Sequence, residues 1–147
     1  YRSSRGLGDV YKRQFLCIFI MATVSDLDAN NIWIIPPFGA SLVLAMALPS
    51  SPLARPKNIV LGHLIAASAG VIAYQILGNN PLSIGIALGL AIYLMLITDT
   101  THPPAGANPI LAVLGGESFD FILMPVALGA IFIVAFSITY NRLLAKS

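Results

Sequence analysis

Charged side chains are scarce in this sequence, and that scarcity excludes most soluble folds. Eight basic and six acidic residues make up only 10% of the chain, whereas 57% is hydrophobic and the mean hydropathy is +0.85. A soluble domain usually carries about 25% charged residues, so this chain has too few to cover a soluble surface. Its 147 residues are enough for one domain. The composition therefore predicts a single-domain membrane protein.

Several other absences narrow the function. The single cysteine, Cys17, excludes an internal disulfide framework and a cysteine-rich metal site. A net charge of +2 is too small to indicate a nucleic-acid partner. The chain has neither HExxH nor GxSxG, and Asp99 with two histidines has no ligand-spacing signature. We therefore expect no enzyme activity, no cofactor, no metal and no nucleic acid.

The first fourteen residues differ from the rest of the chain. They hold four of the eight basic residues, and the composition becomes apolar abruptly at Phe15. We interpret residues 1–14 as a non-native or disordered tail that is left out of fold reasoning. A basic juxtamembrane segment and a cleaved signal peptide are the alternatives. A single transmembrane domain is then expected over residues 15–143.

The remaining chain separates into apolar segments of unequal length. A transmembrane helix needs about 20 apolar residues, which three of the segments approach. Small residues at Gly62, Ala66 and Gly70, and the GxxxG pair Gly85 and Gly89, predict close packing between helices. The segments cover residues 15–24, 32–48, 59–77, 82–97, 102–114 and 121–140. We expect a multi-pass integral membrane protein in the lipid bilayer of a bacterial inner membrane, with a homo-oligomer as an open alternative.

Two of these segments are copies of each other. Residues 36–45 (PPFGASLVLA) align without gaps to residues 103–112 (PPAGANPILA), with six of ten positions identical at an offset of 67. We predict two repeats, about 15–78 and 81–143, each made of a helix, a PPxGA half-helix or helix, and a further helix. The fold class is therefore an all-α bundle of two repeats.

Charge placement indicates how the repeats are oriented. If every segment crosses once, Arg55, Lys57, Arg142 and Lys146 fall on the cytoplasmic side, as the positive-inside rule requires. Three crossings per repeat make the two repeats inverted, a common plan for transporters. Residues 102–114 span only about 20 Å as a helix, so a half-helix is the alternative to a full crossing.

The PPxGA segments are the predicted binding site. Proline favours a helix start, and the residues before it, 34–35 and 100–102, are expected to be non-helical. Two helix N-termini meeting inside the membrane would suit an anion, although packing alone is the alternative. The candidate site residues are Pro36, Pro37, Gly39, Ala40, Ser41, His102, Pro103, Pro104, Gly106, Ala107 and Asn108.

The two histidines are expected to differ in role. An ionisable residue within a membrane is costly and usually functional, so His102 is the candidate to hold a proton or donate to an anion. An N-cap or a bond to a nearby carbonyl is its structural alternative. His63 is expected to be an interhelical hydrogen-bonding residue, and Asp99 a loop or helix-end charge.

Two long blocks of this chain resemble one known family. Residues 101–116 (THPPAGANPILAVLGG) and the block over residues 36–64 are similar to the conserved segments of the HPP family of integral membrane proteins. The resemblance implies about four transmembrane helices and transport of a small inorganic anion, with nitrite the family-based candidate. A regulatory or scaffolding membrane subunit without transport activity is the alternative.

Overall fold

The computed structural model describes residues 4–28 and 32–144, and this part of the chain is helical with no strand. The six α-helices are α1 (Ser4–Leu27), α2 (Pro36–Ala47), α3 (Pro56–Leu77), α4 (Pro81–Ile97), α5 (Asn108–Gly115) and α6 (Leu128–Leu144). Three short helical segments connect them: η1 (Pro52–Ala54), η2 (Pro103–Ala107) and the wider-turned η3 (Ile122–Ala127). The predicted all-α class is confirmed.

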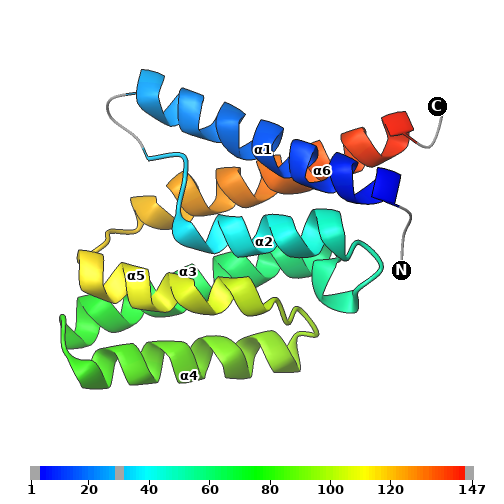
Figure 1. Cartoon of the computed structure of the whole chain (residues 1–147). Helices are drawn as coiled ribbons and strands as arrows, with labels where there is room; N and C mark the ends of the chain where they lie inside the picture. The colour runs from blue at the N-terminus through cyan, green and yellow to red at the C-terminus, as the bar shows by residue number, and fades with distance from the viewer. Residues whose placement is uncertain (1–3, 29–31, 145–147) are drawn as a thin grey trace.

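The chain runs back and forth between two ends of the bundle (Figure 1). Two helices, Pro56–Leu77 and Ile122–Leu143, are long and apolar enough to cross a membrane. The 12 residues of α2 extend only about 18 Å, well short of a hydrocarbon core of about 30 Å. The segment formed by η2 and α5 is about as short, so we call both PPxGA segments half-helices for their length; whether either one crosses the membrane stays a prediction.

Prolines decide where the helices start. Proline occupies the first or second position of α2, α3, α4 and α5, and of η1 and η2. Its missing N–H costs nothing there, and it disfavours helical geometry for the preceding residue, although Asn108 before Pro109 stays helical with φ of −61° and ψ of −43°. Ile35 and His102 accordingly have extended backbones, with φ of −130° and −140°. The predicted non-helical backbone at residues 34–35 and 100–102 is confirmed.

Glycines allow the half-helices to approach the long helices. A Cβ on Gly70 of α3 would lie 2.6 Å from Pro109 Cα, and one on Gly62 would lie 2.8 Å from His102 Cβ. Gly129 of α6 lies against the Phe38 ring in the same manner. By contrast, a Cβ on Gly85 or Gly89 would meet nothing within 4 Å. The close packing expected of that pair is therefore absent within the described chain.

The first helix includes most of the segment expected to be a tail. Residues 4–14 continue into α1, so the structure places them in a helix rather than in a disordered segment. The Arg13 side chain is buried, and it donates to the Asp9 carbonyl at 3.1 Å and to Asn141 Oδ1 at 2.8 Å. Its guanidinium also lies over the Tyr140 ring. Whether this segment is native stays a prediction, and residues 1–3 lie outside the described residues.

Charges separate between the two ends of the bundle. The α2–α3 link, which contains Arg55, lies at the same end as the last turns of α6, which contain Arg142 (Figure 1). The α5–η3 link, with Glu117 and Asp120, lies at the opposite end (Figure 1). This segregation is the one that the positive-inside reading requires. The inverted relation between the repeats stays a prediction.

Cysteine labelling tests which end is cytoplasmic. In a Cys17→Ala background, we expect an impermeant maleimide to label Ser118→Cys from outside intact cells and Ser50→Cys only after permeabilisation, because both serines are exposed. Labelling of Ser50→Cys in intact cells would contradict the predicted orientation.

The packing of α3 against α5 gives a stability prediction. Gly70→Ala should lower the unfolding free energy by about 1–3 kcal/mol, because the added methyl group overlaps Pro109 and Ala112. Gly89→Ala is the matched control and should leave stability unchanged or slightly raised, because its methyl group enters open space. Thermal unfolding of the purified proteins in one detergent measures both. Equal effects of the two substitutions would contradict the packing described here.

Candidate functional site

Four buried polar side chains meet where the half-helices cross α3. They are Ser41 from α2, His63 from α3, His102 immediately before η2, and Asn108 at the start of α5. Each has 0% of its surface exposed. We call these four residues the polar centre. Its residues come from both repeats, and the chain brings them together over a separation of 67 residues.

Short hydrogen bonds connect the four side chains of the polar centre in a single series. Ser41 Oγ lies 2.7 Å from His63 Nε2 and 2.8 Å from His102 Nε2. The outer nitrogen of each ring is also bonded: His63 Nδ1 lies 2.9 Å from Asn108 Nδ2, and His102 Nδ1 lies 2.8 Å from the Leu53 carbonyl oxygen. The two rings meet edge to face, with centroids 5.1 Å apart. A single hydroxyl group thus joins two imidazoles.

The chemistry of the outer partners fixes the direction of these bonds. The Leu53 carbonyl can only accept, so His102 Nδ1 carries a hydrogen and its Nε2 accepts from the Ser41 hydroxyl when the ring is neutral. Asn108 Nδ2 can only donate, so His63 Nδ1 accepts and its Nε2–H donates to Ser41 Oγ. The Asn108 amide orientation follows from its second bond, 3.2 Å to the His63 carbonyl. All bonds therefore run one way, from Asn108 to Leu53.

One acceptor in the polar centre is unused. Asn108 Oδ1 is buried and has no hydrogen-bond partner among the described residues. Buried polar atoms without a partner are rare in folded proteins, because each costs about 1–3 kcal/mol. In the neutral arrangement, therefore, the polar centre offers an incoming ligand an acceptor, and its own donors are engaged with one another.

The helix starts do not supply the free amides that the sequence interpretation relied on. Prolines remove two N–H groups at each start. The next N–H donates internally, from Phe38 to the Ile35 carbonyl and from Ala105 to the His102 carbonyl, each at 3.0 Å. Ligand contacts must therefore come chiefly from the side chains of the polar centre.

The candidate residues divide into two groups. Ser41, His102 and Asn108 lie in the polar centre, and the Pro37 carbonyl oxygen lies 3.2 Å from Ser41 Oγ. The remaining candidates have no polar side chain to bond with it: Pro36, Gly39, Ala40 and Pro103 are exposed, and Pro104, Gly106 and Ala107 are half-buried.

His63 was missing from the candidate site. It is confirmed as an interhelical hydrogen-bonding residue, but its partners place it at the middle of the polar centre. The available signal was its position as a strongly polar residue on an apolar helix. Among the described residues, no group of three His, Cys, Asp or Glu side chains could hold a metal ion.

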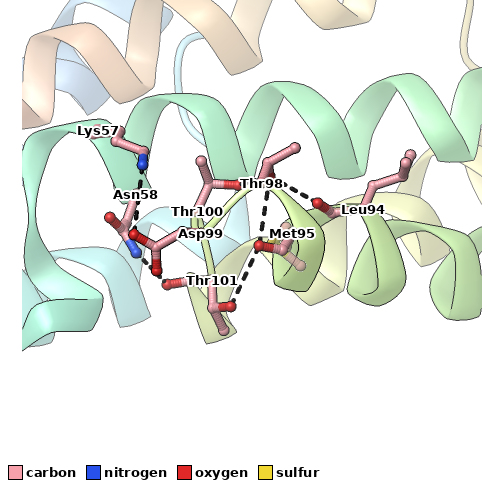
Figure 2. Close-up of polar contacts among 8 residues, drawn as sticks. All are labelled: Lys57, Asn58, Leu94, Met95, Thr98, Asp99, Thr100 and Thr101. Atoms are coloured by element: carbon pink, nitrogen blue, oxygen red, sulfur yellow. Dashed lines mark hydrogen bonds and ion pairs between the residues drawn. The ribbon is translucent and has the colours of Figure 1, made fainter.

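Residues 98–101 form the linker before His102, and hydrogen bonds from α3 and to α4 hold it in place (Figure 2). Asn58 Nδ2 donates to the Thr101 carbonyl at 2.9 Å, and Thr98 Oγ1 donates to the Leu94 carbonyl at 2.7 Å. Lys57 and Asp99 form an exposed ion pair at 3.6 Å (Figure 2). Asp99 is thus the loop charge that was expected. These contacts fix the backbone that carries His102 into the bundle.

A cleft opens at the end of the bundle where α2 begins. Its volume is about 740 Å³, and its walls include Pro36, Leu111 and Phe121, with Glu117 and Asp120 among its polar residues. Burial raises the pKa of the Glu117 carboxyl above its usual value, so part of the negative charge at this entrance is removed more readily than for a free carboxylate. Ser41 lies five residues beyond Pro36, which is about 7–8 Å along α2.

The linker contacts lead to a prediction with a neighbouring control. Asn58→Ala should lower the unfolding free energy by about 1–3 kcal/mol, because it leaves the Thr101 carbonyl without its buried donor. Lys57→Ala should cost no more than about 1 kcal/mol, because the ion pair is exposed. Chemical denaturation in detergent compares the two. A Lys57→Ala variant that loses more stability than Asn58→Ala would contradict this account of the linker.

Known membrane proteins are similar to this chain along most of its length. The chain matches the family model described as "HPP, transmembrane region" over residues 11–147. Two Dictyostelium discoideum proteins, each described as a transmembrane protein, are 31% and 30% identical over 151 aligned residues. The alignments cover 95% of this chain but only 53% and 49% of the relatives. The chain thus spans about half the length of these relatives, and no solved structure matches it significantly.

Proposed function

Because the chain belongs to the HPP transmembrane family, we propose that it is the membrane core of a transporter for a small inorganic anion, with the polar centre as the solute-binding point. It is an integral membrane protein, and we propose the bacterial inner membrane as its location. We propose transport and no catalytic reaction. The observation that carries the proposal is the burial of Ser41, His63, His102 and Asn108 at the crossing of two half-helices.

Packing by itself gives little reason for this arrangement. Interhelical hydrogen bonds in membranes contribute only about 0.6–2 kcal/mol each, and small apolar residues pack helices equally well. This chain already does so at Gly62, Gly70 and Gly129. Histidines within a membrane protein are rare, and they commonly mark a solute or proton pathway. Two of them joined by one hydroxyl therefore support a binding role.

The location of the polar centre suits a transport pathway. Non-helical backbone at membrane depth is tolerated where it is buried in protein or lines a cavity. Here the non-helical residues 100–102 lead directly to His102, and the cleft at the other end of the bundle reaches the start of α2. The half-helices thus bring broken backbone and polar side chains to one place from opposite ends.

The chemistry of the polar centre favours an anion that travels with a proton. With both rings neutral, the centre presents the free acceptor Asn108 Oδ1, which suits a hydroxyl donor better than a bare anion. The carboxyl groups of Glu117 and Asp120 at the cleft likewise disfavour a bare anion. The conjugate acid of a small anion meets both conditions, and nitrite is the candidate that the family resemblance supplies.

The contacts also support the inverted repeats. Ser41 and Asn108 are equivalent at the offset of 67, and both bond to His63. Gly62 and Gly129 are equivalent too, and each lies against the PPxGA region of the other repeat. The histidines have no such copies, because residues 35 and 130 are Ile and Ala. We propose that the helical scaffold is symmetric, whereas the histidines that carry the proton chemistry are not repeated.

Flux through reconstituted vesicles tests the proposal. Purified chain in liposomes should take up nitrite faster than empty liposomes, and His102→Ala should lower the initial rate roughly tenfold or more, because a hydrogen bond to a charged group contributes about 1.5–3 kcal/mol. Ser137→Ala is the control, since the hydroxyl of that buried serine donates to the Ile133 carbonyl within α6. Nitrate and chloride in parallel define the selectivity.

The same assay separates the alternative function. A regulatory or scaffolding subunit would show no flux above empty liposomes for any anion in the panel, although the protein is folded and inserted. Parent-like flux in the His102→Ala variant would remove the polar centre from the pathway. Either result would overturn the proposal.

A further inference from the structure

The polar centre has two self-consistent arrangements of hydrogen atoms, and they differ by one proton. The Ser41 hydroxyl has a single hydrogen and two acceptors within reach: His102 Nε2 at 2.8 Å and the Pro37 carbonyl oxygen at 3.2 Å. In the neutral arrangement, the hydrogen points to His102. If His102 Nε2 gains a hydrogen, that nitrogen becomes a donor to Ser41 Oγ, and the hydroxyl must donate to Pro37 instead.

We propose that His102 is a proton-binding residue that takes up one proton at Nε2, and that the Ser41 hydroxyl turns from Nε2 to the Pro37 carbonyl to accommodate it. One N–H bond forms at Nε2 and one O–H bond breaks in the proton donor, which is hydronium from the solvent or the conjugate acid of the solute and leaves as water or as the anion. Ser41 Oγ then accepts from both rings, which its two lone pairs allow. Each of the four hydrogen bonds between Asn108 and the Leu53 carbonyl keeps the same two heavy atoms.

His102 is the acceptor because the surroundings of the two rings differ. The unprotonated nitrogen of His63, Nδ1, faces the Asn108 amide nitrogen at 2.9 Å, and that nitrogen also donates to the His63 carbonyl. A proton on His63 Nδ1 would place two donors against each other. The unprotonated nitrogen of His102 faces a hydroxyl that can turn. The protonated site is thus selected by what lies opposite each lone pair.

The position of His102 stays fixed while the proton binds. Its Nδ1–H donates to the Leu53 carbonyl in both arrangements. Its Cβ packs directly against Gly62, which has no side chain. The surrounding backbone is tied down by Asn58. The ring is therefore held rigidly. Proton uptake requires only that the Ser41 hydroxyl hydrogen rotate.

No described carboxylate lies beside the proton that His102 would bind. The helices α2 and α5 carry no charged side chain, and the one titratable side chain of α4, Tyr93, is exposed. From α3, His63 faces the ring, while Lys57 is paired with the exposed Asp99 and Tyr74 lies against Gly116. Arg55, which follows η1, is exposed, and Glu117 lies at the cleft. The counter-ion must then be the bound anion, and this clause alone rests on the proposed function.

Nitrogen NMR tests proton binding without any transport. The chain contains two histidines, so ¹⁵N-histidine labelling in nanodiscs gives two rings to follow. At high pH, we expect opposite neutral tautomers, with hydrogen on Nδ1 of His102 and on Nε2 of His63. As the pH falls, His102 should gain the first proton while His63 stays neutral. Identical tautomers, or a first proton on His63, would overturn the proposal.

Vesicles containing a pH dye and nitrite connect proton binding to transport. Anion-dependent proton uptake should be lost in Ser41→Ala and retained in Ser41→Thr, which keeps the hydroxyl, and in Ser137→Ala. Nitrite flux in the parent chain without proton uptake would overturn the coupling while leaving the proposed transport intact. The predicted tautomers and proton on His102, in a chain without flux, would support the proton site and remove the proposed function instead.

Discussion

The hydroxyl group of Ser41 is the contact on which the interior of this bundle depends. It is the shared partner of two imidazoles that come from different helices and different repeats. Without it, the facing nitrogens of His63 and His102 would be buried opposite each other without a bonding partner, at a cost of about 1–3 kcal/mol for each unsatisfied group. The positions of α2, α3 and the segment before η2 are consequently coupled through one oxygen atom.

Broken backbone and close packing make that contact possible. The prolines at 36–37 and 103–104 end any continuous helix and force extended residues before them, so His102 enters the bundle on a non-helical segment. Glycine at 62 then removes the Cβ that would collide with His102. Proline sets the direction of the chain and glycine provides the space. Neither feature alone would place the imidazole against Ser41.

The polar centre differs from a conventional anion site at helix N-termini. Such sites depend on several free peptide N–H groups, whereas here proline removes two at each start and the next donates to a nearby carbonyl. The remaining donors belong to side chains that are already bonded to one another. We propose that a site of this kind responds to protonation more strongly than to negative charge alone. That property fits a solute that carries a proton and a cleft that contains carboxyl groups.

Much of this protein could be derived from its sequence, for local reasons. Low charge and apolar runs predicted an all-α membrane protein, proline predicted the helix starts at Pro36 and Pro103, and spacing predicted the packing at Gly62 and Gly70. Each of these depends on a residue and its near neighbours. Ser41, His102 and Asn108 were also identified, because they lie in or beside the repeated motif.

Tertiary structure decided what those residues do. His63 joined the site because α3 places it between Ser41 and Asn108, and no local pattern encodes contacts 22 and 45 residues apart. The acceptor for His102, the Leu53 carbonyl, is a backbone atom and leaves no trace in residue type. Gly85 and Gly89 share the spacing of a packing motif yet face open space, since a glycine pair shows that helices can approach but not which partner does. Local chemistry is written in the sequence, whereas the pairing of distant groups depends on how the helices pack.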